Sequence, residues 1–359
     1  MPSHVTVSGV QFDILASTLR ILRDKEVDNT FRNIPLLDAC QRHGNIEQTD
    51  GGSYIDAPVI LTDHSTITQL TTGYESINLA VKDPLRTANY KWCDFIAPVV
   101  LTEKEELSNK GERAIIRIAE ARMKSVMGML KREFEKQIVA GSSTVLTDLE
   151  SLYYGGTSGF QGWMQDSDFG AQDNSVGNIS KTDFPTSWQN QVARVSSYTL
   201  GELSDAMTQL YIDSQIYAPE GEIDIILCSP ASYRAYKSEL QSRERYTSVA
   251  AEKDMAGRLV LMFNGAAMYV EPYLLDGSGN SGLPAYAAGG GSSSNYIHMY
   301  MLNSKLFNMY FDRDAYFTLG DMERISGYAA LSANLMTRTQ LTTQNLSGHG
   351  IIVSDSQTF

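Results

Sequence analysis

The stretch ERAIIRIAEARMKSVMGMLKREFEKQIV, residues 112–139, decides the fold. Its apolar side chains recur every three or four residues, which is the spacing of one face of an α-helix, and charged residues fill the other faces. At 1.5 Å per residue, a helix of this length is a rod of roughly 42 Å. The sequence therefore predicts one long helix on which a sheet packs. Its apolar stripe is Ile115, Ala119, Met123, Val126, Leu130, Phe134 and Ile138.

The residues just before this helix predict a short helix and a strand. Thr102-Glu103-Lys104-Glu105 has capping-box spacing, and the helix that it starts is expected to end at Asn109-Lys110-Gly111. Residues 95–101 are apolar with β-branched content, and Ile77, Leu79 and Val81 alternate, so 77–101 is expected to contain strand.

Residues 45–76 predict an extended β-hairpin. Two runs rich in Ile, Val, Thr and Tyr, 54–61 and 66–72, flank a polar break at 62–65. A two-stranded ribbon alone in water is marginal, so it either packs on its own domain or reaches onto a neighbour. Residues 1–44 are a polar lead segment that cannot form a core alone and must lie on something else.

The residues after the long helix predict a compact α+β unit. Residues 150–187 are rich in Gly, Asp and Ser and are expected to form a long excursion. Thr199-x-x-Glu202 is expected to cap a helix over 199–217, and Pro230 to open a helix through Leu240. Strands are expected at 222–228, 259–263, 266–270, 296–302 and 307–311.

Composition excludes several classes of protein. The 359 residues carry 29 Lys and Arg against 42 Asp and Glu, a net charge of −13. The chain has no apolar run that could cross a bilayer, and its first 19 residues contain no Lys or Arg, so membrane-spanning and secreted roles are not expected. The acidic balance argues against tight binding of nucleic acid. Three widely spaced cysteines are expected to be reduced thiols.

The search for catalytic chemistry finds no convincing motif. The HExxH motif, the dipeptide Gly-Lys and the GxSxG motif do not occur. Residues 277–282 match GxGxxG, but Pro284 and a Gly/Ser-rich run follow, which indicates a loop rather than the helix that a dinucleotide site needs. Asp166-Ser167-Asp168 lacks the glycine and glutamate of a calcium loop. We therefore expect no catalytic, cofactor-binding or metal-binding residues and no enzyme activity.

The order of parts resembles the major capsid proteins of tailed bacteriophages, which have the Hong Kong 97-type fold. The likeness runs over nearly the whole chain. The strings that carry it are 87–92 (TANYKW), 97–100 (APVV), 105–112 (EELSNKGE), 226–233 (ILCSPASY) and 263–266 (FNGA).

The resemblance implies an α+β capsid fold in five segments. These are an N-terminal arm (1–44), an E-loop β-hairpin (45–76), a peripheral domain (77–140) with the spine helix at 112–139, an axial domain (141–325) with a loop insertion near 276–295, and a C-terminal return to the peripheral domain (326–359).

The resemblance also implies a function and partners. The protein would be a structural major capsid (head) protein of a virion, assembled in the host bacterial cytoplasm. Pentamers and hexamers, joined through the E-loop and the N-terminal arm, would close an icosahedral shell around double-stranded DNA held without sequence-specific binding. A portal is implied, and a cement or decoration protein is compatible with this picture. Because only about 44 residues precede the hairpin, either a separate scaffolding protein or a short segment that does its work is expected.

One departure from the type member of the family concerns covalent cross-linking. That protein joins a hairpin lysine to an asparagine of a neighbour, whereas residues 45–76 here contain no lysine. Cross-linking of this form is therefore expected to be absent. Two other readings stay open: another virion protein such as a tail-tube or decoration subunit, and an unrecognised α+β hydrolase. Tail-tube and decoration subunits are mostly β and lack a long spine helix.

Overall fold

The computed structural model describes residues 34–63, 66–71, 73–76, 79, 83–108, 112–140, 175–195, 201–218, 220–243, 261–271 and 298–354. The chain forms two compact units. Unit 1 is Met1–Arg32, Asp94–Phe134 and Phe311–Arg338, and unit 2 is Asn33–Cys93, Glu135–Tyr310 and Thr339–Phe359. The predicted loop near 276–295 and residues 150–174 of the predicted excursion lie outside the described residues, as do residues 1–33 of the predicted arm.

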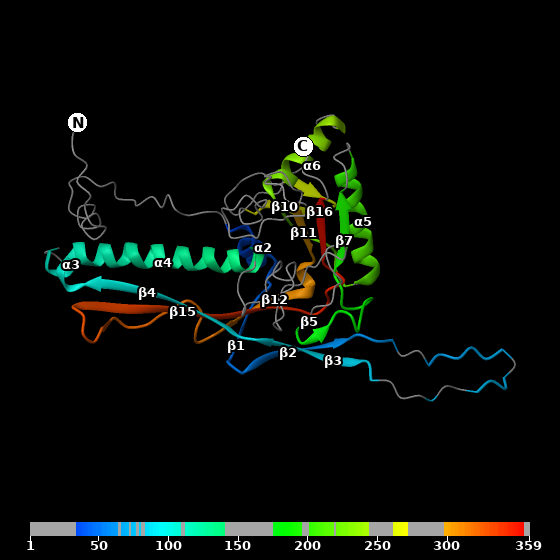
Figure 1. Cartoon of the computed structure of the whole chain (residues 1–359), viewed down its shortest axis with the longest axis horizontal. Helices are drawn as coiled ribbons and strands as arrows, with labels where there is room; N and C mark the ends of the chain where they lie inside the picture. Colours follow the sequence, from blue (N-terminus) through cyan, green and yellow to red (C-terminus); the bar gives the residue numbers. More distant parts are fainter. Residues whose placement is uncertain are drawn as a thin grey trace, which may run out of the picture. The chain divides into compact units, whose positions relative to one another are not determined.

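Unit 1 is built on a long helix and a sheet. Helix α4 (Glu112–Ala140) confirms the predicted spine helix, and its residues up to Phe134 belong to this unit. Strand β15 (Ala330–Thr343) pairs with β4 (Cys93–Thr102), β13 (Thr318–Leu319) and β14 (Glu323–Arg324). Figure 1 shows α4 running alongside β4 and β15, so the helix lies along the strands.

The core of unit 1 is aromatic. Phe134 of α4 contacts the ring of Phe95 edge-on, with 5.8 Å between centroids, and that of Phe311 at 6.0 Å. Phe311 in turn meets Tyr316 at 5.0 Å. Leu130 and Phe134 of the predicted stripe are buried, as expected for the face that meets the sheet.

One half of the predicted capping box, the bond made by Glu105, is present at the start of α3 (Glu103–Ser108). The backbone N–H of Thr102 donates to Glu105 Oε2 at 3.0 Å. Arg122 of α4 donates to the same carboxylate, with a contact of 2.6 Å to Oε1, and this hydrogen bond lowers the pKa of Glu105 to about 2. Glu105 therefore both starts α3 and ties it to α4.

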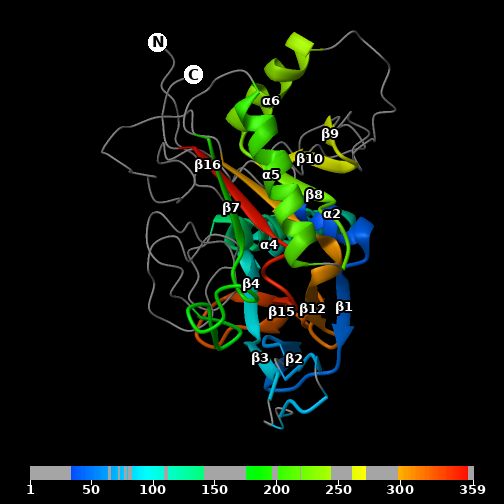
Figure 2. The same ribbon diagram turned by 90° about the vertical axis from the view of Figure 1, so that its right-hand side faces the viewer.

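Unit 2 contains the second large sheet. Its strands β7 (Gln191–Val195), β16 (Gly350–Ser354), β11 (His298–Leu302), β8 (Ile225–Cys228), β10 (Ala266–Val270) and β9 (Leu261–Phe263) lie in that order. Helices α5 (Glu202–Tyr217) and α6 (Pro230–Arg243) cover one face (Figure 2). Met207, Leu210, Ile226, Met268 and Ile352 are among the side chains of the core between them. The predicted strand 266–270 and the helix opened by Pro230 are confirmed.

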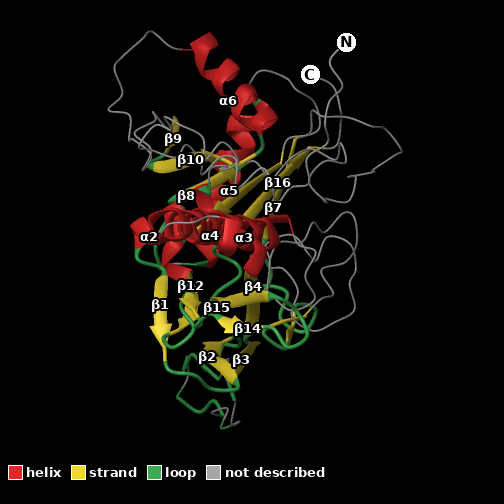
Figure 3. Cartoon of the chain, turned by 90° about the vertical axis from the view of Figure 1, so that its left-hand side faces the viewer, coloured by secondary structure: helices red, strands yellow, loops and turns green. Residues whose placement is uncertain are grey.

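Unit 2 also holds the segments that precede and follow this sheet. Helix α2 (Pro35–His43) leads into β1 (Ile46–Thr49), which pairs with β12 (Phe307–Asp312). The short 3-10 helix η2 (Ser304–Leu306) precedes β12, and β5 (Ser175–Val176) pairs with β6 (Ile179–Ser180). Figure 3 shows these helices and strands by type. Residues 34–44 of the predicted arm thus contain helix α2, which belongs to unit 2.

Three sequence-based expectations differ from the structure. Strand β2 (Tyr54–Ile60) pairs with β3 (Leu85–Lys91), and not with residues 66–72. Helix α5 starts at Glu202 after Gly201, and Thr199 lies outside the described residues. The C-terminal return is divided, because β16 lies in the sheet of unit 2 between β7 and β11. In each case a partner distant in sequence decides the boundary, and local propensity does not.

Candidate assembly surfaces

The hairpin formed by β2 and β3 is the most unusual part of unit 2. The two strands are antiparallel and pair from Tyr54 opposite Lys91 to Ile60 opposite Leu85. The described residues between the strands, 61–63, 66–71, 73–76, 79 and 83–84, contain no helix or strand. The connection of this hairpin, residues 61–84, is therefore longer than both of its seven-residue strands together, and far longer than the usual two to five residues.

The base of the hairpin is firmly held. Ala88 and Tyr90 of β3 are fully buried. The Tyr90 hydroxyl donates to the carbonyl of Thr343 at 2.9 Å, and the N–H of Asn89 donates to the carbonyl of Gly177 at 2.9 Å. At the other end of the paired strands, the Ser187 hydroxyl donates to the Leu61 carbonyl at 2.9 Å. Contacts with segments distant in sequence thus fix the direction in which the hairpin leaves unit 2.

The tip of the hairpin has the opposite character. Ile67, Tyr74 and Leu79 are 96%, 99% and 86% exposed. Leu70 and Leu85 are also exposed. The N–H groups of Thr71 and Gly73 donate to the carboxylate of Glu75, at 3.0 and 3.1 Å, so local turns shape this segment. A row of large apolar side chains with this exposure marks a surface that another molecule covers.

The connection between the two strands is acidic as well as exposed. Residues 61–84 carry three acidic residues, Asp63, Glu75 and Asp83, against one basic residue, Lys82. An acidic and apolar element of this kind fits a receiving surface that is basic and apolar.

Unit 1 carries a surface of that kind on α4. The described side chains from Arg122 to Phe134 include four cationic ones and one acidic one, Glu133. Lys124 is exposed, as are Met127 and Met129 between the charged positions. On β4, Ile96 and Val100 are exposed as well. Apolar side chains among cations are the complement of the hairpin tip.

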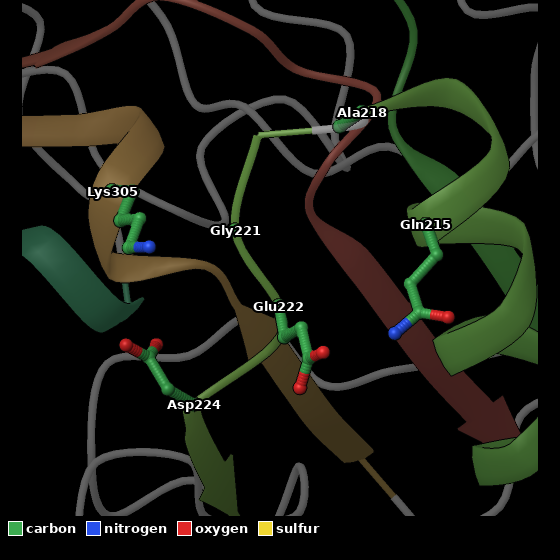
Figure 4. Close-up of a pocket in the computed structure, with 6 residues that line it drawn as sticks. All are labelled: Gln215, Ala218, Gly221, Glu222, Asp224 and Lys305. Atoms are coloured by element: carbon green, nitrogen blue, oxygen red, sulfur yellow. The ribbon is translucent and has the colours of Figure 1, made fainter.

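A surface pocket of about 510 Å³ in unit 2 is the place to test for catalysis (Figure 4). Its lining residues are Gln215, Ala218, Gly221, Glu222, Asp224 and Lys305. The Asp224 carboxylate accepts hydrogen bonds from the N–H of Ser304, at 2.9 Å, and from the Ser304 hydroxyl. His43 Nδ1 lies 3.3 Å from Asp224 Oδ2, the oxygen that also accepts from the Ser304 hydroxyl.

These three groups do not form a hydrolytic triad. In such a triad the imidazole lies between the hydroxyl and the carboxylate, so that it can take the hydroxyl proton. Here the carboxylate of Asp224 lies between them. Glu222 is engaged as well, because it accepts from the Tyr211 hydroxyl at 2.9 Å. The carboxylates of the pocket therefore hold η2, α2 and α5 in place.

Other titratable side chains of unit 2 are also structural. His349 is fully buried, and desolvation lowers its pKa to about 3, so the neutral ring accepts from the N–H of Asn303. Burial likewise lowers the pKa of Lys181 to about 7, and this amine donates to Asn190 at 3.2 Å. Burial raises the pKa of Cys40 and Cys228, so these thiols stay protonated.

Neither a metal site nor a membrane span is found among the residues that the structure describes. No group of three or more His, Cys, Asp or Glu side chains there is arranged to hold a metal ion. No helix in the same ranges combines the length and the apolar character that crossing a bilayer requires.

Comparison with solved structures shows the fold. The capsid of cyanophage A-1(L) matches with a TM-score of 0.59 and 12% identity, over 95% of this chain and 98% of that one. The capsid structure of Mycobacterium phage Ogopogo matches with a TM-score of 0.54 and 10% identity, over 98% and 100% of the two chains. The SrpI encapsulin of Synechococcus elongatus matches with a TM-score of 0.54 and 8% identity, over 97% and 96%. The chain has the Hong Kong 97-type capsid fold.

Sequence searches alone do not reach this result. No protein-family model matches the chain, and no curated protein matches it either. The capsid fold was nevertheless predicted from the order of the elements, since the spine helix α4 and the strand–proline–helix string at β8 and α6 were placed correctly. Sequence reasoning expected strand within 77–101 but missed the pairing of β3 with β2. The signal for β3 was the alternation of Ala88 and Tyr90 with polar residues, which is typical of a half-buried strand.

Proposed function

We propose that this chain is a structural major capsid protein, and that copies of it form pentamers and hexamers of a closed icosahedral shell. The proposal rests on the contrast between the base and the tip of the β2–β3 hairpin. Its base is buried in its own unit, whereas Ile67, Tyr74 and Leu79 at the tip are almost fully exposed. The matched phage capsids share the fold over nearly their whole length, which supports an assembling role.

In the proposed shell, each hairpin lies across a neighbouring copy of the same chain. The acidic and apolar tip would meet the face of α4 around Lys124, Met127 and Met129, or β4 next to it. Burying each large apolar side chain of the tip contributes about 1.5–3 kcal/mol. Several such contacts per subunit, repeated around a closed shell, would offset the cost of ordering the loop.

The segments of the chain take the following roles in this proposal. Residues 1–44 form an arm, and the hairpin serves as the E-loop. The parts around α4 and β4 form the peripheral domain, and the unit 2 sheet with α5 and α6 forms the axial domain. A portal, a separate scaffolding protein and a cement protein would be further partners, and assembly would take place in the cytoplasm of a host bacterium.

The proposed cargo is double-stranded DNA that is enclosed without sequence-specific contacts. The net charge of −13 supports this, because an acidic wall confines DNA and does not hold it. The matched structures include an encapsulin complex as well as phage capsids, so the fold alone does not identify the cargo. The nucleic acid content of isolated particles therefore tests the cargo separately from the shell.

We also infer that the chain is not an enzyme. The hydroxyl, carboxylate and imidazole groups nearest to a catalytic set, Ser304, Asp224 and His43, are in the wrong order for acyl transfer. A hydrolase would lose turnover on one substitution in the pocket of Figure 4. We expect that Asp224→Asn instead changes stability, since it weakens the hydrogen bonds to η2.

Negative-stain microscopy of the expressed full-length chain tests the proposal. Closed particles of tens of nanometres are expected, and their absorbance ratio at 260 and 280 nm reports on nucleic acid. A chain that stays monomeric at high concentration, with and without a co-expressed scaffolding protein, would contradict the shell. Particles that never contain DNA in an infected host would contradict the cargo alone.

A further inference from the structure

Two helices of unit 2 begin without a capping side chain of their own. At α2 the cap residue is Ile34, and at α5 it is Gly201; neither makes a side-chain cap. The first N–H groups of a helix have no partner within the helix, so a group from elsewhere must accept from them. A carboxylate is well suited, because the helix dipole favours negative charge there.

In both helices a glutamate from a third element supplies this carboxylate. Glu135 of α4 accepts from the N–H groups of Leu36 and Leu37, at 3.0 and 3.5 Å. Glu239 of α6 accepts from those of Leu203 and Ser204, both at 3.2 Å. The geometry of the two caps is thus nearly the same.

The surroundings of the two carboxylates differ in one respect. Glu135 is hydrogen-bonded to a second fully buried carboxyl group, that of Glu271 just after β10. Strand alternation explains this contact. Met268 points into the core under α5 and α6, so Tyr269 and Glu271 point to the other face of the sheet. Arg42 of α2 contacts the Tyr269 hydroxyl at 3.4 Å, which shows that α2 lies on this face.

Several other titratable groups lie on the elements around Glu135 and Glu271. Burial, followed by the charge of Glu271, raises the pKa of Glu135. Glu271 also raises the pKa of the Cys228 thiol, and Glu135 that of the Cys40 thiol. The charged and titratable side chains on α2, on β8 with the residue before it, and on β10 are Asp38, Cys40, Arg42, His43, Asp224, Cys228 and Tyr269.

We propose that Glu135 and Glu271 form a buried site for a single proton, and that this proton holds the first turn of α2 on unit 2. Two carboxylates in contact in an apolar interior do not both ionise at neutral pH. With one proton shared between them, one carboxyl group donates to the other, and Glu135 still accepts from the two N–H groups of α2. The proton is taken from solvent when α2 docks.

The sign of the pH dependence follows from this arrangement. A carboxyl group whose pKa is higher in the folded state stabilises that state at low pH, and the contribution is lost as the pH rises through the folded-state value. At high pH the proton returns to solvent and leaves two adjacent buried negative charges. The first turn of α2 then detaches, and α5, which is capped by Glu239, serves as the reference within the same chain.

Amide hydrogen exchange of the purified full-length chain, followed by mass spectrometry from about pH 5 to about pH 9, tests the proposal. The protection of the α2 peptide is expected to fall relative to that of the α5 peptide, by up to about tenfold per pH unit above the pKa of the pair. Because both peptides come from one sample, the intrinsic pH dependence of exchange cancels in their ratio.

Two matched variants sharpen the test. Glu271→Gln keeps a donor to Glu135 but cannot ionise, so the α2 to α5 ratio should become independent of pH. Glu239→Gln should weaken α5 equally at every pH. A ratio that is already flat in the wild-type chain, which needs no variant, would overturn the proposal. An unchanged slope in Glu271→Gln would overturn it too. Neither result depends on whether shells form.

Discussion

The base and the tip of the β2–β3 hairpin belong to one continuous segment, but their side chains lie in opposite environments, buried at the base and exposed at the tip. At the base, Ala88 and Tyr90 are fully buried, and their backbone and hydroxyl groups are hydrogen-bonded within unit 2. At the tip, Ile67 and Tyr74 are almost fully exposed. The base therefore contributes to the stability of the chain itself, and the tip contributes only once another molecule covers it.

This difference separates stability from assembly. A substitution at the base should unfold the subunit, whereas a substitution at the tip should leave a folded subunit that cannot assemble. The following experiments test that separation.

The largest effect is expected for a charge placed at the tip. Ile67→Asp should abolish particle formation, because a carboxylate would be buried in the contact with a neighbour. The thermal midpoint of the unassembled subunit should not change. Gln69→Asp, which adds the same charge beside it without removing an apolar group, is the matched control and should still give particles in negative stain. Normal particles from Ile67→Asp would show that the tip is not a contact.

At the base, Gly177→Ala should destabilise the subunit by about 2–4 kcal/mol, from left-handed strain plus steric overlap. Gly177 has φ of 58°, and an added Cβ would lie 2.7 Å from the Cβ of Ala88. Gly265→Ala separates the two causes, because φ there is 89° but the space is open. Urea denaturation should show the smaller loss for Gly265→Ala; equal losses would mean that the close contact with β3 is unimportant.

A smaller effect is expected from one hydroxyl group. Tyr90→Phe removes the partner of the Thr343 carbonyl and N–H groups, which are buried, and should cost about 1–3 kcal/mol. Tyr74→Phe is the same change at the tip and should cost less than about 0.5 kcal/mol. Chemical denaturation of the two variants measures the contrast. A loss at Tyr74 as large as that at Tyr90 would contradict it.

No covalent cross-linking is expected through residues 45–76, because this stretch contains no lysine; the lysines of the β2–β3 hairpin, Lys82 and Lys91, lie beyond it. Reduced and boiled particles should therefore run on a denaturing gel as one band near 39.7 kDa. A ladder of oligomers would refute this, and the hairpin contacts would then not be held by non-covalent burial alone.

Much of the fold could be predicted because its signals are local. The spine helix α4 has an apolar face repeated every three or four residues, and Glu105 accepts from the backbone N–H of Thr102 at the start of α3, as the capping-box spacing predicts. Pro230 likewise marks the start of α6. Each of these signals lies within a few residues of the element that it specifies.

What the sequence did not reveal depends on distant partners. The second strand of the hairpin was placed at 66–72, whose Ile, Thr and Leu residues favour strand, but that segment lies in the tip, and Leu85–Lys91 pairs instead. The carboxylate that caps α2 comes from a residue 99 positions away, and the one that caps α5 from a residue 36 positions away, so no local sequence pattern predicts either cap. The Gly177-Asn178 dipeptide between β5 and β6 has positive φ at both residues, and it is a local signal that could have predicted this hairpin turn.

The measurement that tests the central claim most directly is hydroxyl-radical footprinting of Tyr74 in the unassembled subunit and in isolated particles, with Tyr90 as the internal reference. Tyr74 is 99% exposed and Tyr90 is fully buried in the single chain. Tyr74 should react readily in the subunit and become protected in the particle, while Tyr90 stays protected in both. Equal reactivity of Tyr74 in the two states would show that no neighbour covers the tip.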